Sequence, residues 1–487
     1  MSLSTLFLIV FIMLLACTGL YAMRRTKSLE DFFLGGRKVG PWISAFSYGT
    51  SYFSAVIFIG FAGNLGWKYG WPAMSIGLGN AIFGSLCAWL VLARRTRRMT
   101  QNLGAMTMPG FFAERYAAPW LKPLTALIIF IFLVPYSASV YKGLGYLFQE
   151  NFGIPFDVAL WLMTGVAAIY LLLGGYLAMT LADFIQGLIM LFGSAMLIWV
   201  LAGKGGGFAN VLSNITTARV AHHPVSTFDW YVLGSAVFLT SFATWGLPQM
   251  IQKYYAIKSE SVIFKATVIT TIFAFVIGCA AYFSGAMTHL FFKSGLEGRN
   301  FDTLVPIMLK DWLPKPLLAI FLLLIFSASM STLASLVLVS SSTVAIDFYR
   351  SYINKQGSDG SSVTLMRIMS ALFLLASLLI AKTNSKFIVD LMSLSWGAVG
   401  GSFLAPYLYG LYWKKVTKAG AFAGIVTGLS LQVGLFLFTK LPATFASTIA
   451  ILAPFITVPL VSLLSSKHPV PQSVIDKAFA PAQPESK

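Results

Sequence analysis

Two hydrophobic stretches of this chain are interrupted by polar and glycine residues where a membrane helix should be continuous. The first interruption covers residues 47–54 (SYGTSYFS) and the second covers residues 240–248 (TSFATWGLP). They are separated by about one five-helix unit, the size of a transporter repeat. Unwound backbone is tolerated at bilayer depth only where it lines a cavity. Breaks at corresponding places in two halves of the chain therefore predict a transport site.

The composition indicates that most of the chain lies in lipid, since 57% of its 487 residues are hydrophobic and only 10% are charged. Apolar runs near the roughly 20 residues that a bilayer needs predict about thirteen transmembrane helices. We expect an all-α polytopic membrane protein with one transmembrane domain over residues 1–465 and a poorly ordered tail over residues 466–487. The expected spans are 3–23, 41–64, 71–93, 121–146, 156–176, 177–201, 229–252, 262–292, 315–346, 362–382, 386–411, 418–438 and 442–465.

The net charge of +18 does not indicate a nucleic-acid partner, because the basic residues fall on alternate loops. Basic residues cluster in the segments 24–38, 94–98 and 414–418, and Lys253 and Lys258 belong to the same series. The positive-inside rule places such loops in the cytoplasm. We therefore expect a multi-pass protein of the cell membrane, with lipid as its surroundings, its N-terminus outside and its C-terminus in the cytoplasm.

The sequence shows none of the usual signs of an enzyme or a metal protein. Cys17, Cys87 and Cys279 are far apart in apolar runs, so neither a disulfide nor a metal framework is expected. No expected span places a histidine beside a cysteine or a carboxylate as a nucleophile and base would require. We expect no catalytic residues, no cofactor and no bound metal other than Na⁺ as a coupling ion.

The expected helix 315–346 carries small and hydroxyl side chains on one face. Ala328, Ser331, Thr332 and Ser335 follow the spacing i, i+3, i+4 and i+7. Hydroxyls, together with carbonyls freed by a broken helix, supply the oxygens that a small cation needs. The alternative is that these hydroxyls bond to their own backbone or join neighbouring helices.

Charged residues inside spans are the second class of candidates, because each costs about 2.5 to 3.5 kcal/mol at a helix centre on insertion scales. Asp183 lies inside a span and is either a functional carboxylate or a structural partner. Lys142 lies nearer a span end, where it could contact substrate or extend to the interface. Asp347 and Asp390 lie near span ends, and we interpret both as interfacial.

Several motifs together resemble the sodium:solute symporter family from about Leu29 to about Thr427. They are residues 33–37 (FLGGR), residues 174–178 (GGYLA) with Asp183 and Gln186, residues 330–332 (MST), and residues 410–412 (GLY) with Lys415 and residues 420–421 (GA). The resemblance implies a five-plus-five inverted-repeat core of the LeuT type, with repeats at about 41–201 and 229–411, that works by alternating access.

The resemblance also implies a sodium site between the first break and the helix 315–346. Its ligands would be the carbonyls of Thr50, Phe53 and Ala328 and the hydroxyls of Ser331 and Thr332. Some relatives bind a second sodium ion through a carboxylate and further hydroxyls, a pattern that Asp183 and Ser335 match. Ala334 stands where those relatives have a serine, so the second ion is left open.

The sequence indicates the identity of the substrate less closely than that of the coupling ion. Proline transporters of the family have an Asp where this chain has Tyr52, and aromatic residues where it has Thr240 and Thr244, although Tyr136 and Pro248 are kept. This difference argues against proline and for the amino-acid, monocarboxylate and pantothenate branches. We expect a small organic solute with a carboxylate, bound by a monomer near Tyr52, Ser54, Tyr136, Lys142, Thr240, Thr244 and Pro248. The alternative is a sodium-independent facilitator or channel.

Overall fold

The computed structural model describes residues 3–24, 28–222, 225–293, 296, 298–354, 359–383 and 387–481, and these residues form helices and their connections. The first half contains α1 (Leu3–Met23), α2 (Leu29–Leu34), η1 (Gly35–Arg37), α3 (Pro41–Tyr52), η2 (Val56–Phe61), α4 (Ala62–Tyr69), η3 (Trp71–Ala73), α5 (Met74–Gly79), η4 (Asn80–Cys87), η5 (Trp89–Ala93), α6 (Arg94–Leu103), α7 (Met108–Arg115), α8 (Leu121–Phe152), α9 (Phe156–Lys204) and α10 (Val211–His222). The second half contains α11 (Thr227–Phe242), η6 (Ala243–Trp245), α12 (Pro248–Tyr255), η7 (Glu260–Val262), α13 (Ile263–Phe291), η8 (Phe301–Thr303), α14 (Leu304–Trp312), α15 (Lys315–Ser342), η9 (Thr343–Ile353), α16 (Asp359–Thr383), α17 (Ile388–Tyr412), α18 (Lys418–Phe438), α19 (Ala443–Leu452), α20 (Pro454–Leu464) and α21 (Gln472–Ala478).

Ten helices among the described residues are long and apolar enough to span a bilayer, or twelve if each of two bent pairs is one span. The expectation of about thirteen helices is not confirmed as a count. It would also require Phe156–Ile169, which is a shorter apolar helix. Phe156–Ile169 is the first part of α9, and the chain turns between the two parts at Gly175, whose φ of 56° favours glycine.

Both expected breaks are present, and each is shorter than the polar stretch that predicted it. The α3 helix continues through Tyr52, and the chain leaves helical geometry at Phe53, with φ −104° and ψ 130°, before η2 begins. The two parts of this span are bent by 46°. In the second pair, helical geometry is lost at Leu247, and Pro248 starts α12 after a bend of 42°. Proline at this position suits a helix start because it has no N–H to leave unpaired.

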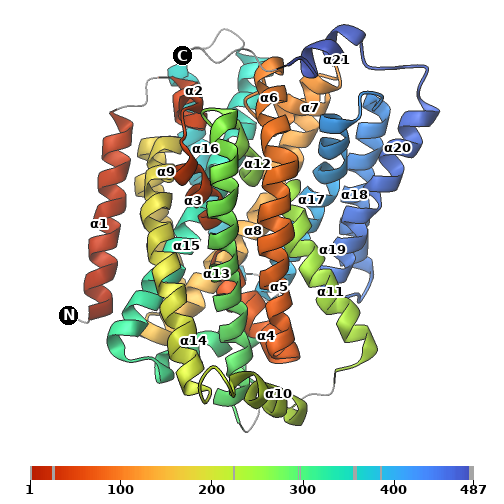
Figure 1. The fold of residues 1–487 in the computed structure, drawn as a ribbon. Helices are drawn as coiled ribbons and strands as arrows, with labels where there is room; N and C mark the ends of the chain where they lie inside the picture. Colours follow the sequence, from red (N-terminus) through yellow and green to blue (C-terminus); the bar gives the residue numbers. More distant parts are fainter. Residues whose placement is uncertain are drawn as a thin grey trace.

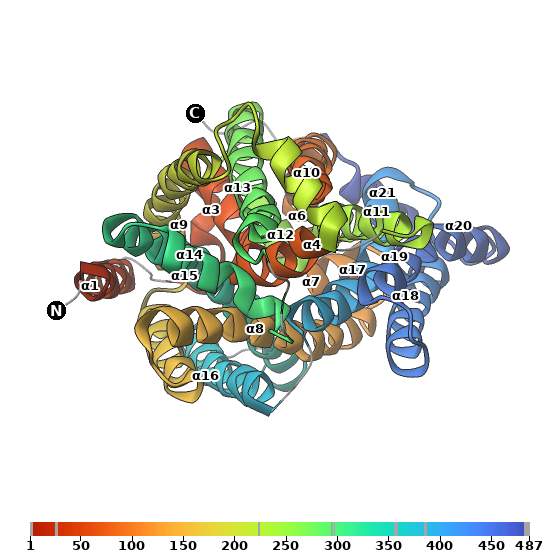
Figure 2. The same cartoon turned by 90° about the horizontal axis from the view of Figure 1, so that it is seen from below.

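The two broken helices lie at the centre of the bundle (Figures 1 and 2). Long helices surround them: α3 contacts α9, α13 and α15, and α12 contacts α3 and α15. The backbones of α5 and α13 approach closely at Gly77 and Gly278, where a Cβ added at Gly77 would lie 2.6 Å from the backbone of Gly278. Small residues permit such close packing between membrane helices. Figure 2 shows α1 and α20 on opposite flanks.

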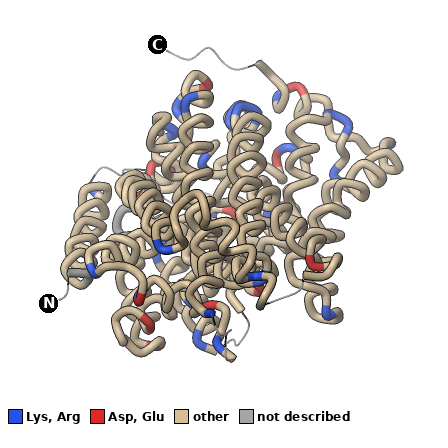
Figure 3. Tube along the Cα trace, turned by 60° about the horizontal axis from the view of Figure 1, so that its bottom comes forward, with Lys and Arg blue, Asp and Glu red and all other residues tan. Residues whose placement is uncertain are grey.

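The start of α1 and the short helix α21 lie at opposite ends of the bundle (Figure 1). The expected poorly ordered tail differs from the structure over Gln472–Ala478, which forms α21 with Ile475 and Ala478 buried. This helix contacts α6 and α7. Figure 3 shows basic residues around the end of the bundle that carries α21 and further ones near the opposite end.

Candidate functional site

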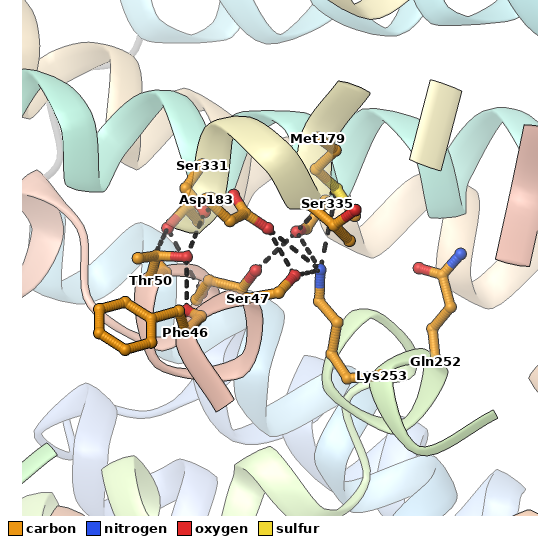
Figure 4. A network of polar contacts seen from close by, with 12 residues as sticks. Phe46, Ser47, Thr50, Met179, Asp183, Gln252, Lys253, Ser331 and Ser335 are labelled. Atoms are coloured by element: carbon orange, nitrogen blue, oxygen red, sulfur yellow. Dashed lines mark hydrogen bonds and ion pairs between the residues drawn. The ribbon is translucent and has the colours of Figure 1, made fainter. Parts of the chain in front are cut away.

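Asp183 on α9 is the centre of a fully buried polar cluster between α3, α12 and α15 (Figure 4). Its Oδ2 accepts a hydrogen bond from Ser47 Oγ on α3 at 2.5 Å. Its Oδ1 accepts one from Ser331 Oγ on α15, also at 2.5 Å. Hydroxyl groups from two neighbouring helices therefore satisfy both oxygens of this carboxylate.

The residues proposed for the sodium site come together beside Asp183. Thr332 Oγ1 lies 3.1 Å from the Ala328 carbonyl and 3.4 Å from the Thr50 carbonyl. Ser331 Oγ lies 2.8 Å from Thr50 Oγ1, and this contact joins the pair to Asp183. Phe53 is buried at the break, where its backbone is extended. The five predicted ligands therefore come from two neighbouring segments, the end of α3 and the middle of α15.

The basic residue at this cluster is Lys253, and its predicted place in a cytoplasmic loop is wrong. Lys253 belongs to α12, and its side chain is fully buried. Its Nζ donates to Ser47 Oγ at 2.9 Å and to Ser335 Oγ at 3.1 Å, and it lies 3.8 Å from Asp183 Oδ2. The two residues matched to a second sodium, Asp183 and Ser335, thus both face an ammonium group (Figure 4).

Most of the predicted substrate residues gather at a second cluster, around Trp396 on α17. Tyr136 and Tyr52 place their rings 5.5 Å and 6.4 Å from the Trp396 ring. The Tyr52 hydroxyl donates to the Thr240 carbonyl at 2.6 Å, across the two broken helices. The remaining members are Ser54, whose side chain interacts with Tyr136, and Thr244, whose side chain interacts with Tyr52.

Pro248 and Lys142 lie outside this aromatic cluster. Pro248 lines a small cavity with Gln252 and Tyr255 of α12 and with residues 106–109. Lys142 is buried on α8, and its charge interacts with those of Asp302 and Asp390. The next residue, Gly143, packs against Ala55 beside the first break. The structure therefore places Lys142 near an acidic group on the connection after α13, and a substrate contact for it stays a prediction.

Asp302 lies in η8, outside the membrane-spanning segments, and is fully buried. Burial raises the pKa of its carboxyl group to about 6, although the Ile388 N–H and Lys142 oppose this change. The Ile388 N–H donates to Asp302 Oδ2 at 3.2 Å, which ties η8 to the start of α17.

The sequence predicted the wrong surroundings for Asp347 and did not identify Lys253 as a site residue. Asp347 was expected at the interface but is fully buried in η9, where Thr107 Oγ1 donates to it at 2.6 Å. Lys253 could have been identified from its position five residues after Pro248, on a helix that restarts inside the bundle. Ser47 lay in the predicted break at residues 47–54 but was not singled out as a site residue, and Trp396 carried no comparable signal because aromatic residues are common throughout the chain.

Comparisons with known proteins agree on one family and one fold. The model of the sodium:solute symporter family matches residues 32–428. The chain is 30% identical over 453 residues to the high-affinity proline transporter PutP of Bacillus subtilis strain 168, covering 89% of this chain and 93% of that protein. It is 31% identical over 424 residues to the osmoregulated proline transporter OpuE of the same organism, covering 84% of each.

Among solved structures, the fold is similar to that of a Na⁺-coupled sialic acid symporter in a substrate-bound outward-open state. The TM-score is 0.81, the identity is 18%, and 99% of each chain is covered. This likeness shows the fold, which is the five-plus-five inverted-repeat core of LeuT-type transporters.

Proposed function

The chain belongs to the sodium:solute symporter family, and we propose that it imports a small carboxylate-bearing solute together with Na⁺ by alternating access. Its relatives are transporters, and this chain is a multi-pass membrane transporter rather than an enzyme. Proline is the first substrate to test, because both Bacillus subtilis relatives are proline transporters. The residues Tyr52, Thr240 and Thr244 differ from those of the family's proline transporters and favour other carboxylates. Testing proline first decides between these two indications.

The observation that carries the proposal is the meeting of the first break with the hydroxyl face of α15. The carbonyls of Thr50, Phe53 and Ala328 and the hydroxyls of Ser331 and Thr332 supply five oxygens within one chain, so a monomer suffices. Ser331 also joins this set to the buried charge of Asp183, 2.5 Å away. A fixed negative charge in a low-dielectric site favours a bound cation.

The aromatic cluster suits a zwitterionic solute. Tyr52, Tyr136 and Trp396 present ring faces and edges near the break, and such faces attract an ammonium group. The hydroxyls of Ser54 and Thr244 provide hydrogen-bond partners for a carboxylate. A bound amino acid would therefore lie next to the ion site, since Ser54 follows the ion ligand Phe53 directly.

We propose that the α21 end of the bundle faces the cytoplasm and that the start of α1 faces outside. The basic segment of α6 supports this orientation, since Arg94 and Arg98 bind Glu260 and Arg97 binds the carbonyls of Ile257 and Lys258. On the same face, Val39, before α3, and Ile257, after α12, form a backbone bridge.

The test is uptake of radiolabelled proline by proteoliposomes, with and without an inward Na⁺ gradient. One Na⁺ driven by about 100 mV and a tenfold gradient supplies about 3.7 kcal/mol, enough for an accumulation of several hundred-fold. We expect accumulation only with Na⁺, and pantothenate and pyruvate serve as comparison substrates. Equal uptake with K⁺ in place of Na⁺ would indicate a facilitator, and uptake of another carboxylate instead would correct the substrate.

A further inference from the structure

The cluster around Asp183 already contains a cation that belongs to the protein. Lys253 Nζ is surrounded by Ser47, Ser335 and Asp183 at 2.9, 3.1 and 3.8 Å, and Met179 Sδ lies 3.8 Å away on another side. Its charge also lies 5.4 Å from the centre of the Tyr176 ring. An ammonium group has three hydrogen-bond donors, and two of them reach hydroxyl oxygens here.

These oxygens are the ones that a second sodium ion would need. Ser335 and Asp183 are the matched residues, and Ser47 is the hydroxyl that links them to α3. An Na⁺ and an ammonium group at this position would compete for the same oxygens and would repel each other in a dehydrated site. The position therefore holds one monovalent cation at a time.

The two oxygens of Asp183 divide the cluster into two cation positions. Oδ2 lies on the side of Ser47 and Lys253, while Oδ1 accepts from Ser331 on the side of Thr50. Ser51 Oγ and Ser335 Oγ are 2.7 Å apart and close the space on the lysine side. The carboxylate can thus face the ammonium group with one oxygen and a sodium site with the other.

We propose that Lys253 is a tethered cation that occupies the second cation position, so that this symporter binds one Na⁺ per molecule. The inference rests on the sodium site proposed above and adds the stoichiometry. Because Lys253 is on α12 and Ser47 is on α3, the ammonium group also joins the broken helices of the two repeats. The role that a mobile second ion has in some relatives is carried out here by a side chain that never leaves the protein.

The test is the number of ²²Na⁺ ions bound per molecule of purified protein at saturation. We expect one for the wild type and one for Lys253→Arg, which keeps the charge. Lys253→Met removes the charge and frees the oxygens, so the number should double to two. Lys265→Met, at an exposed lysine of α13, is the matched control and should stay at one. Two ions in the wild type, or one ion in folded Lys253→Met, would overturn the proposal.

A further variant keeps the test decisive if Lys253→Met does not fold. Lys253→Met combined with Asp183→Asn removes both buried charges, which is tolerated better than removing one. It should bind a single Na⁺, because the second position has lost its carboxylate, and a count of two would contradict the proposal. A wild-type count of zero would overturn the proposed sodium site together with this inference, whereas a count of two would overturn this inference alone.

Discussion

Two buried aspartates of this protein face a lysine at the same distance and in different surroundings. Asp183 and Lys253 are 3.8 Å apart, as are Asp347 and Lys122. Both oxygens of Asp183 accept hydroxyl hydrogen bonds, whereas among the described residues no hydrogen-bond donor reaches Asp347 Oδ2. The Lys253 side chain is fully buried, and that of Lys122 is 23% exposed.

The two sites differ in the exposure of the lysine and not in the distance between lysine and aspartate. Lys122 also donates to Ser351 at 2.6 Å and reaches solvent, so water can share its charge. Among the described residues, the hydrogen bonds and the ion pair of Lys253 Nζ are all made with the cluster around Asp183. A charge in that position cannot be lost without leaving another charge buried and uncompensated.

The largest expected difference is between Asp183→Asn and Asp347→Asn. Asp183→Asn removes the charge that Ser331 joins to the sodium site, and losing a hydrogen bond to a charged group costs about 1.5–3 kcal/mol, so Na⁺-driven uptake per folded protein should fall by about 10- to 100-fold. Asp347→Asn should lose less than about tenfold, since Lys122 is partly solvated. The measurement is initial uptake normalised to folded protein in the membrane. Equal losses in the two variants would remove the distinction.

Bulky substitutions at positions that touch neither aspartate test whether ion and substrate bind apart. Ser54→Trp and Thr244→Trp should each fill the aromatic cluster and lower substrate uptake by at least about fivefold, since overpacking a close-packed site costs about 1–3 kcal/mol. The ²²Na⁺ count should stay at the wild-type value, because the ion ligands are on α3 and α15. Wild-type uptake by both variants would place the substrate elsewhere.

A smaller effect is expected at the lysines themselves. Lys122→Met removes a partly exposed partner, which is worth about 0–1 kcal/mol, so uptake should change by less than about fivefold. The same change at Lys253 should alter both the ion count and the amount of folded protein. A loss at Lys122 as large as that at Lys253 would show that exposure does not separate the two pairs.

Asp302 is a third buried aspartate and lies outside the spans. Its effect on the pH dependence of stability is expected to be the smallest of those predicted here. Its pKa of about 6 in the folded protein is above the ordinary value of 3.8, so the folded state binds the proton more tightly. The ionised carboxylate therefore destabilises the fold at neutral pH, by at most about 3 kcal/mol. This loss is relieved as the pH falls through about 6.

In a thermal unfolding assay, the wild type should thus gain a few degrees relative to Asp302→Asn between pH 7.5 and 5, since about 1 kcal/mol shifts the midpoint by several degrees in small domains and by less in larger ones. Asp390→Asn, at a neighbouring carboxylate, is the control for a general effect of charge. A constant difference between wild type and Asp302→Asn across this pH range would contradict the assignment.

The sequence predicted the breaks because glycine, hydroxyl residues and proline are rare together inside apolar spans. It placed them over residues 47–54 and 240–248, and the structure narrows them to the neighbourhood of Phe53 and Leu247. The grouping of Thr50, Ser331 and Thr332 was also predictable, because helical spacing fixes one face and the family resemblance supplies its partner.

The surroundings of Asp183 were less predictable. Lys253 looked like a topology signal because charge counts along a chain do not reveal that α12 restarts inside the bundle. Asp347 looked interfacial because its position near a span end hides the packing of η9 against α8 and α16. Both errors come from contacts between residues far apart in the chain, which spacing and composition do not encode.

We propose that Na⁺ lies between the break that follows α3 and the hydroxyl face of α15. The most direct measurement is the Na⁺ concentration for half-maximal uptake by Thr332→Ala. Losing one oxygen from a charged ligand set costs about 1.5–3 kcal/mol, so this concentration should rise by about tenfold or more. Ser342→Ala is the matched control, because the buried Ser342 hydroxyl on the same helix donates to its own backbone at Val339. An unchanged Na⁺ dependence of uptake in Thr332→Ala would contradict this position of the sodium ion.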